Sequence, residues 1–493
     1  MRIHAVFLWL ACASVAAANP AAAVAAAHAD CARLPEDAQK RTRYFSLYAI
    51  PEKGRAEYAK VMNVHINSLS REAHPQPCRV VAKDLLAVDI RDYTWDAKVW
   101  ERLATEDPYF HALIEITKTV ETTIQKHYPA GTYDGKYYEA GDWPVVVRTK
   151  TKVKKTSAAP WLPPKETAAL ALMTQSEIPI VRADWFLFQT AIQADRKAGY
   201  YDFLGLGKSQ KDFEELLGGD EVKSKKAKRE IIGLMARSGV TLNNRVITRL
   251  GAASGGWWKT YDFKKSFDRS NVLRQLDADL EPPEGDASEQ YGHLPNDLFT
   301  FWLQNGQGVR QDFAPDFIAS NKSSPHATSD NDGRVHIGLS CIACHVAGLQ
   351  PVKDYARRLY KGSIQLASPD HAKLVRLRQL YLSDLDGAIR DDNAKYVRAL
   401  HKISGMKPAE FAKAYAAAWY DYAEKDLDAD RFARELGTTK AHLVKALKAR
   451  AKSITGLDPV LALLIADEPL DIRREHADEA FALAQIIIRE IKP

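Results

Sequence analysis

Cysteine is scarce in this chain of 493 residues, which has only five. That number excludes a small fold held together by a dense set of disulfide bonds. Long apolar runs are also lacking, since the longest covers about 13 residues and a membrane-spanning helix needs about 20. Basic residues outnumber acidic ones only by 69 to 63, so the net charge is +6. This excess is too thin to indicate nucleic-acid binding.

The remaining composition is that of a globular protein with a sizeable core. Hydrophobic residues make up 46% of the chain and charged residues 27%, and the mean hydropathy is −0.33. A chain of this length has room for about three domains.

The N-terminal residues have the pattern of a secretory signal peptide. Arg2 provides a positive charge, a short apolar stretch follows, and small residues create cleavage sites before Asn19 or before His28. We assign residues 1–27 to this signal. A membrane anchor is the alternative, but the apolar stretch is short for one. We therefore expect a periplasmic or otherwise exported protein without a membrane span in the mature chain.

The most specific motif is Cys341-Ile342-Ala343-Cys344-His345. It matches the Cys-x-x-Cys-His attachment signature of c-type haem. Two thiols at this spacing bond to the two vinyl groups of the haem, and the adjacent imidazole reaches the iron. The motif therefore predicts one covalent haem c, with Cys341 and Cys344 as thioether ligands and His345 as the proximal iron ligand.

Other interpretations of this motif explain less of it. A thioredoxin-like redox pair does not need His345 and normally follows a strand in a βαβ unit. A structural zinc site needs four ligands, and the chain has no second Cys-x-x-Cys. Because the motif occurs once, a multihaem electron wire is excluded within this chain.

Cys31 and Cys78 remain after cleavage as a pair in an oxidising compartment. We expect a disulfide between them, which would close a loop of about 47 residues and contribute about 4 kcal/mol in the entropic model. Two buried free thiols are the alternative.

The fold class expected is α+β and mainly helical, in four regions after the signal peptide. Residues 28–165 form an N-terminal α+β domain with a loose start at 28–42. Residues 166–290 form an aromatic-rich middle region. Residues 291–405 form a haem c-binding region, and residues 406–493 a C-terminal helical region.

Local patterns add detail to these regions. The stretch 298–313, with Asn305-Gly306 at its centre, predicts a β-hairpin leading into the haem motif. The basic run at 149–155 is typical of a solvated loop or hairpin face. Helices are expected from 368 onward, with a stop at Gly405 and further helices near 428–436, 439–452 and 475–491. Three aromatic patches in the middle region are expected in the core, or alternatively around the haem; they are 184–186, 200–203 and 257–263.

Several segments together resemble a bacterial family of exported, single-haem, c-type cytochrome-like proteins. The resemblance spans roughly residues 42 to 490. It implies haem binding, iron and electron transfer, and it supplies no substrate or partner. The segments that carry it are GLSCIACHVAGL, NSLSRE, VDIRDYTWDAKVWERL, RADWF, YYDFLGL, SGVTLNNR and WWKTYDF.

The sixth iron ligand separates electron transfer from catalysis, because an open position binds oxygen species or peroxide. Met406 is our candidate, since it follows His345 by a separation common in small cytochromes c and precedes a proline. An iron whose sixth position has no protein ligand is a further alternative. The weaker candidates are Met173, Met235, His293, His326, His336, His371 and His401.

These observations predict an exported monohaem electron-transfer protein whose partner is an unidentified redox protein. The alternatives are a peroxidase-like or oxygen-handling haem enzyme and a haem-based sensor, both with an open distal site. Whether the chain is an enzyme is left open, with electron transfer favoured over catalysis.

Overall fold

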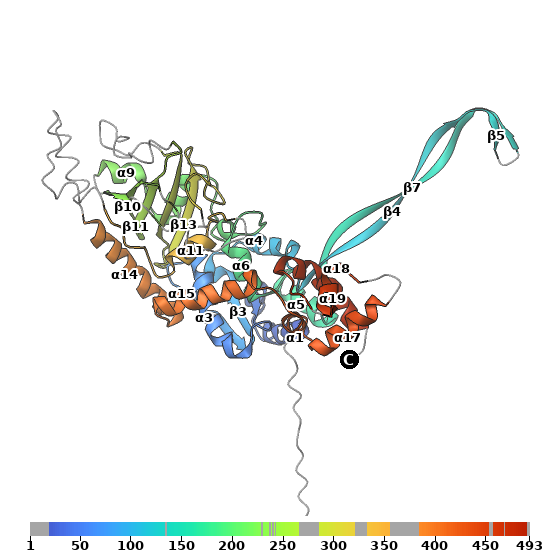
Figure 1. Cartoon of the computed structure of the whole chain (residues 1–493), viewed down its shortest axis with the longest axis horizontal. Coiled ribbons are helices and arrows are strands. Elements are labelled where there is room, and N and C mark those ends of the chain that lie inside the picture. Colours follow the sequence, from blue (N-terminus) through green and yellow to red (C-terminus); the bar gives the residue numbers. More distant parts are fainter. Residues whose placement is uncertain are drawn as a thin grey trace, which may run out of the picture.

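The computed structural model describes residues 19–490. Several segments within that range are not described: 134–135, 228–229, 236–237, 239–240, 242, 266–284, 321–332, 355–383, 453–456 and 468. Over the described residues the fold is α+β and mainly helical, which confirms the expected class. Two sheets, a long β-hairpin and a group of C-terminal helices make up the molecule (Figure 1). Most of the expected signal peptide and the predicted helix start at residue 368 lie outside the described residues.

The N-terminal sheet has four strands in the order β2–β3–β1–β8. Strand β1 (Thr42–Ser46) pairs antiparallel with β3 (Leu85–Asp89) and parallel with β8 (Ile180–Arg182), while β2 (Arg79–Ala82) extends the sheet beyond β3. All five residues of β1 are buried, so both faces of this strand are covered.

Residues 28–42 are ordered rather than loose, which corrects the expectation for this segment. Helix α1 (Pro20–Cys31) starts with the Asn19 side chain accepting a hydrogen bond from the backbone of Ala22, and proline at the first position favours this start. Helix α2 (Glu36–Arg41) follows. The buried side of α1 packs against β1, β2 and α5 (Pro164–Thr174); its residues are Ala23, Val24, Ala27 and Cys31.

Helix α3 (Arg55–Ser68) and helix α6 (Ala183–Ala191) pack against each other beside this sheet. The apolar residues of α3 recur at helical spacing and are buried, among them Val61 and Met62. Phe186 of α6 contacts Trp100 and Phe203 with ring centroids 5.5 and 5.4 Å apart. These contacts bring the aromatic segments of the middle region into the core.

A long hairpin leaves the main body beside the C-terminal helices, on the side away from the second sheet (Figure 1). Strands β4 (His111–Tyr128) and β7 (Gly141–Ala158) pair along their whole length, and short strands β5 (Gly131–Tyr133) and β6 (Lys136–Tyr138) pair at its tip. The basic run at 149–155 lies on β7, so it belongs to a hairpin.

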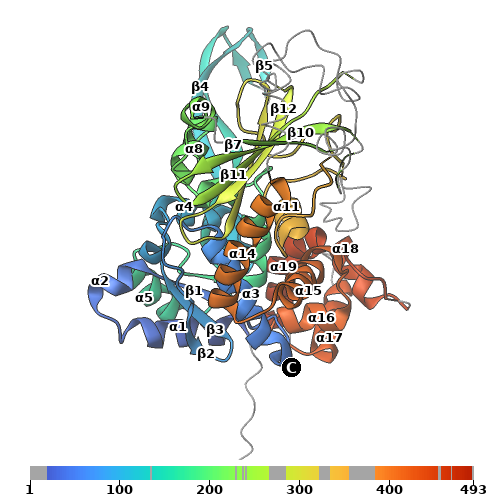
Figure 2. The same ribbon diagram turned by 90° about the vertical axis from the view of Figure 1, so that its left-hand side faces the viewer.

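The second sheet has five antiparallel strands in the order β13–β12–β11–β10–β9. The strands are β9 (Ile231–Met235), β10 (Arg245–Ala252), β11 (Gly255–Tyr261), β12 (Ala287–His293) and β13 (Phe299–Asn305). Trp257 and Trp258 of β11 are fully buried, so the third aromatic patch is core, as expected. Figure 2 shows helix α14 (Leu385–Ser404) lying along this sheet.

The hairpin expected over 298–313 forms only in part. Its turn exists, because Gly308 donates a backbone hydrogen bond to the Asn305 carbonyl at 3.0 Å. The main partner of β13 is nevertheless β12, and the returning chain makes only a bridge between Gln304 and Arg310. Arg310 also donates its backbone N–H to the Lys208 carbonyl, so the returning segment pairs with another part of the chain as well.

The C-terminal region is helical, as its sequence predicts. Helix α14 ends at Gly405 in the left-handed region (φ +69°), and α15 (Pro408–Trp419) begins with proline. Phe411, Tyr415 and Trp419 are buried on one side of α15. The later helices are α16 (Ala429–Glu435), α17 (Lys440–Ala451) and α19 (Arg474–Glu490), close to the expected ranges.

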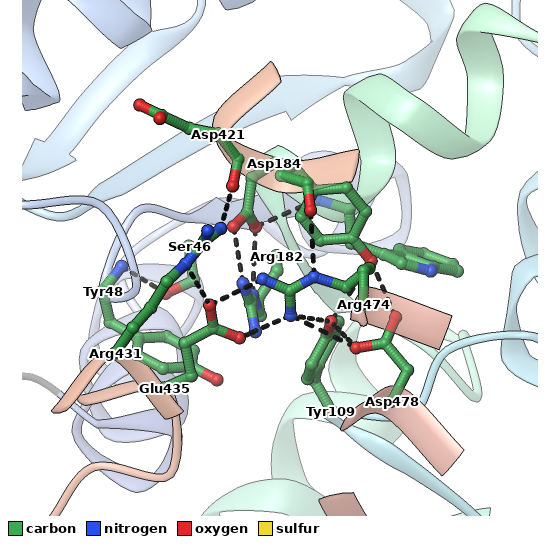
Figure 3. A network of polar contacts seen from close by, with 12 residues as sticks. Ser46, Tyr48, Tyr109, Arg182, Asp184, Asp421, Arg431, Glu435, Arg474 and Asp478 are labelled. Carbon is green, nitrogen blue, oxygen red and sulfur yellow. Dashed lines mark hydrogen bonds and ion pairs between the residues drawn. The ribbon is translucent and has the colours of Figure 1, made fainter. Parts of the chain in front are cut away.

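A buried ion-pair network joins the N-terminal sheet to these helices (Figure 3). Arg182, at the end of β8, donates to Asp184 at 3.0 and 2.5 Å and to Glu435 of α16 at 2.8 Å. Arg474 of α19 donates two hydrogen bonds of 2.7 Å to Glu435 and pairs with Asp478 at 3.3 Å. The side chains of Arg182, Glu435 and Arg474 are 0%, 3% and 6% exposed.

The charges in this network balance. Arg431 adds a third cation at 3.3 Å from Glu435, so three arginines face the three carboxylates of Asp184, Glu435 and Asp478. Burial by itself would raise the pKa of Glu435, but Arg182 and Arg474 hold that pKa well below its usual range. The network therefore depends on the Glu435 carboxylate remaining ionised.

Candidate functional site

The Cys-x-x-Cys-His motif forms helix α11 (Leu339–His345). Cys341, Cys344 and His345 follow each other at i, i+3 and i+4, which places them on one side of the helix. The helix begins with the N–H of Ile342 donating to the Gly338 carbonyl at 2.7 Å. Of these three residues, only His345 lines the cavity beside the helix.

Gly338 permits this helix to start where it does. Its φ of +77° lies in a region that side chains rarely adopt. A Cβ atom there would overlap the carbonyl oxygen of Ala191 and approach the Tyr200 ring to 2.9 Å. The motif helix is thus held close to the end of α6 by a contact that only glycine allows.

Neither Cys341 nor Cys344 is in a disulfide bond in this structure, and both residues are partly exposed. Burial is the largest cause that raises the pKa of Cys341, and the charge of Glu289 raises it further. Thiol–disulfide exchange requires a thiolate, which a lowered pKa provides. This environment therefore disfavours the thioredoxin-like interpretation of the motif.

The His345 ring lies against the second sheet. Its centroid is 5.4 Å from the Tyr291 ring of β12 and 5.8 Å from the Phe301 ring of β13. On the same sheet, Phe299 stacks on Tyr396 of α14 with ring centroids 4.7 Å apart. Aromatic side chains therefore hold His345 on an apolar surface.

A small cavity adjoins His345. It encloses about 20 Å³, room for about one water molecule. Helices α3, α11, α14 and α15 and the start of β13 supply its walls, which are mostly apolar. The lining residues are Val64, His65, Ser68, Leu298, Phe299, Phe301, Ile342, His345, Tyr396, Phe411 and Tyr415.

His65 is the second imidazole at this cavity, and the sequence patterns did not single it out as a ligand. It is 1% exposed, and its Nε2 atom lies 2.7 Å from the Thr190 hydroxyl oxygen. Its Nδ1 atom is buried without a hydrogen-bond partner. Burial lowers the pKa of His65 to about 3, so the ring is neutral at physiological pH. The sequence signal that could have identified His65 is its position among the apolar residues that recur at helical spacing on α3.

Hydrogen bonds to the Asp392 side chain connect helix α14, which carries Tyr396, to the second sheet. This buried carboxylate accepts hydrogen bonds of 2.8 and 2.9 Å from Arg249 of β10 and one of 2.8 Å from the Trp258 indole of β11. Tyr396, one turn further along, donates its hydroxyl to the Val346 carbonyl at 2.9 Å. These bonds connect the sheet, α14 and the end of the motif helix.

The structure does not bring Met406 to this cavity. Met406 is 5% exposed and lies between α14 and α15, where its backbone N–H donates to the Ser404 hydroxyl at 3.1 Å. It is not among the residues that line the cavity beside His345. Its role as an iron ligand stays a prediction.

The other weaker candidates for the sixth ligand are also away from the lining residues. Met173, Met235, His293, His336 and His401 lie among the described residues, but none of them lines the cavity. His326 and His371 lie outside the described residues.

Cys31 and Cys78 are buried free thiols in this structure. Cys31 ends α1 close to the Tyr44 hydroxyl, and Cys78 lies near Tyr93. Their sequence neighbours do meet, since Arg79 donates two hydrogen bonds of 2.6 Å to the Asp30 carboxylate. The disulfide between Cys31 and Cys78 stays a prediction. The segments that carry the two cysteines lie next to each other in the structure.

The residues around α11 suit a c-type haem by their chemistry. Two thiols and an imidazole share one side of a helix, and a second imidazole with an unpartnered nitrogen lies across an apolar cavity. A haem is much larger than the 20 Å³ of this cavity. Its binding therefore requires the surrounding side chains to move apart.

A much larger cleft lies elsewhere, at the far side of the second sheet. It encloses about 650 Å³ and has polar walls from α8 (Gln210–Leu217), α9 (Glu221–Lys226) and β11. Two of its lysines pair with one carboxylate, because Lys259 donates to Glu221 at 2.7 Å and Lys225 pairs with Glu221 at 3.0 Å. Volume alone therefore does not identify a site here.

Comparison with known proteins gives no match among protein-family models, curated proteins or solved structures. Within the described ranges, no helix combines the length and the apolar character needed to cross a membrane. The same residues hold no cluster of three or more His, Cys, Asp or Glu arranged to bind a metal ion without a further group.

Proposed function

We propose that this protein is an exported electron-transfer protein with one covalently attached haem c. The observation that carries the proposal is that Cys341, Cys344 and His345 share one side of α11 and that His345 lines a mostly apolar cavity. The resemblance to exported single-haem cytochrome-like proteins supports the same assignment. The partner is a redox protein.

The haem iron would supply one-electron chemistry, and the protein residues set its surroundings. Cys341 and Cys344 hold the ring by two thioether bonds. His345 binds the iron, and the rings of Tyr291 and Phe301 keep its imidazole in place. Phe299, together with the aliphatic lining residues, excludes water, which favours the less charged, reduced state.

The proposal is tested on the purified mature protein by a pyridine haemochrome assay with oxidised and reduced spectra. We expect a c-type haemochrome with one haem per chain. The double variant Cys341→Ala/Cys344→Ala should lose covalent haem entirely. Cys78→Ala, at a buried cysteine outside the site, is the matched control and should keep it.

Two results would contradict this function. One is a wild-type protein without a c-type haemochrome. The other is a double variant that still holds haem covalently after denaturation. A high-spin spectrum with peroxide turnover would instead assign the site to catalysis.

A further inference from the structure

We propose that His65 is the sixth ligand of the haem iron, opposite His345, and that it binds through Nδ1. The inference rests on the proposed haem and deepens it. Its basis is that one cavity is lined by both imidazoles, although they are far apart in the sequence. Helix α3 supplies His65 and helix α11 supplies His345.

The hydrogen bonds around His65 determine which nitrogen is available. The Thr190 hydroxyl has one hydrogen, and it donates that hydrogen to the Phe186 carbonyl at 2.8 Å. Thr190 is therefore the acceptor in its 2.7 Å contact with Nε2 of His65. We accordingly place the ring proton on Nε2, which leaves a lone pair on Nδ1.

That lone pair has no hydrogen-bond partner among the residues that the structure describes. Nδ1 of His65 is buried and makes no hydrogen bond, although a buried polar atom without a partner destabilises a fold. An iron ion bound there would satisfy it. The Nε2–H bond to Thr190 would then hold the ring orientation, as outer hydrogen bonds do for most metal-ligating histidines.

The other groups near the cavity are weaker ligands. The Tyr415 hydroxyl is also buried without a partner, but a phenol is protonated at neutral pH and is a poor ligand in that form. Met406 is not at the cavity. Among the lining residues His65 is thus the strongest donor besides His345.

Two histidine ligands would make the iron six-coordinate and low-spin. Such a site passes electrons and leaves no position for peroxide or oxygen, so it separates electron transfer from the catalytic alternative. Helix α3 also forms one side of the N-terminal domain, so His65 would connect that domain to the haem.

The experiment compares optical and electron paramagnetic resonance spectra of the oxidised wild type, His65→Gln and Met406→Leu. Glutamine retains an N–H that can donate to Thr190 and nearly fills the same space. We expect a low-spin bis-histidine spectrum in the wild type and in Met406→Leu. His65→Gln should become high-spin, and added imidazole should restore the low-spin spectrum.

Thr190→Val provides a second readout that does not depend on loss of the ligand. It removes the acceptor for Nε2–H, which makes the imidazole a weaker donor to iron. The variant should stay low-spin, and its reduction potential should rise above that of the wild type. A potential unchanged from the wild type would contradict the role of Nδ1.

Failures of the two proposals are distinguishable in the same samples. A pyridine haemochrome that shows no covalent haem in the wild type overturns the proposed function. Covalent haem with a low-spin spectrum in His65→Gln overturns the assignment of His65 alone. A high-spin wild type, or a high-spin Met406→Leu beside a low-spin His65→Gln, does so as well.

Discussion

Replacement of Glu435 by glutamine should destabilise the protein strongly. Its carboxylate accepts three hydrogen bonds of 2.7–2.8 Å from Arg182 and Arg474, and all three side chains are at most 6% exposed. The glutamine side chain has nearly the same shape but no charge. Arg182, Arg474 and the partly exposed Arg431 would then face only the carboxylates of Asp184 and Asp478. Loss of one member of a buried ion pair typically costs about 3–5 kcal/mol.

The expected loss can be measured by urea unfolding followed by circular dichroism and tryptophan fluorescence. Glu479→Gln is the matched control because its side chain is 80% exposed. Glu479 lies on α19, the helix that carries Arg474. That control should change the free energy of unfolding by less than about 0.5 kcal/mol. A Glu435→Gln variant within 1 kcal/mol of the wild type would refute our account of the network.

The pH dependence gives an independent check on the same carboxylate. The pKa of Glu435 is lowered in the folded state, so the unfolded chain binds its proton first as the pH falls. Its contribution is therefore complete above the unfolded pKa of about 4.3 and is lost progressively below it. Wild-type stability should fall more steeply than that of Glu435→Gln between about pH 5 and 3. Parallel curves would contradict the shifted pKa.

Two further predictions concern the backbone. Gly338→Ala should destabilise the protein by more than the roughly 1–2 kcal/mol that a left-handed backbone conformation alone costs, because its Cβ would overlap Ala191. Gly405→Ala is the control in urea unfolding, since Gly405 has φ +69° but open space around it. Equal losses of unfolding free energy in the two variants would contradict the clash. N-terminal sequencing of the exported protein should find Asn19 as the first residue, because Asn19 caps α1 and α1 is part of the core. A mature chain that starts at His28 would show that α1 is dispensable.

The candidate site separates the features that local sequence patterns can predict from those that they cannot. The motif at Cys341, Cys344 and His345 is readable because haem attachment needs neighbouring residues at fixed spacing. The opposite side of an iron ion has no such constraint, since any segment that folds next to it can supply a ligand. The search for a partner near His345 in sequence therefore favoured Met406, whereas the cavity brings in His65 from the N-terminal domain.

The sequence by itself determined the features that depend on neighbouring residues. It predicted the mainly helical α+β class, the C-terminal helices, the stop at Gly405 and the buried aromatic patches. Each of these follows from periodicity, capping or composition within a window of a few turns.

Only the tertiary structure decided the contacts between distant segments. It placed β12 rather than the following chain beside β13, and it packed α1 into the core. It paired Arg182 with Glu435, 253 residues later. It also brought His65 and His345 to one cavity. The physical reason is that such contacts depend on which buried surfaces meet when the whole chain collapses, and many pairings are equally compatible with the local patterns.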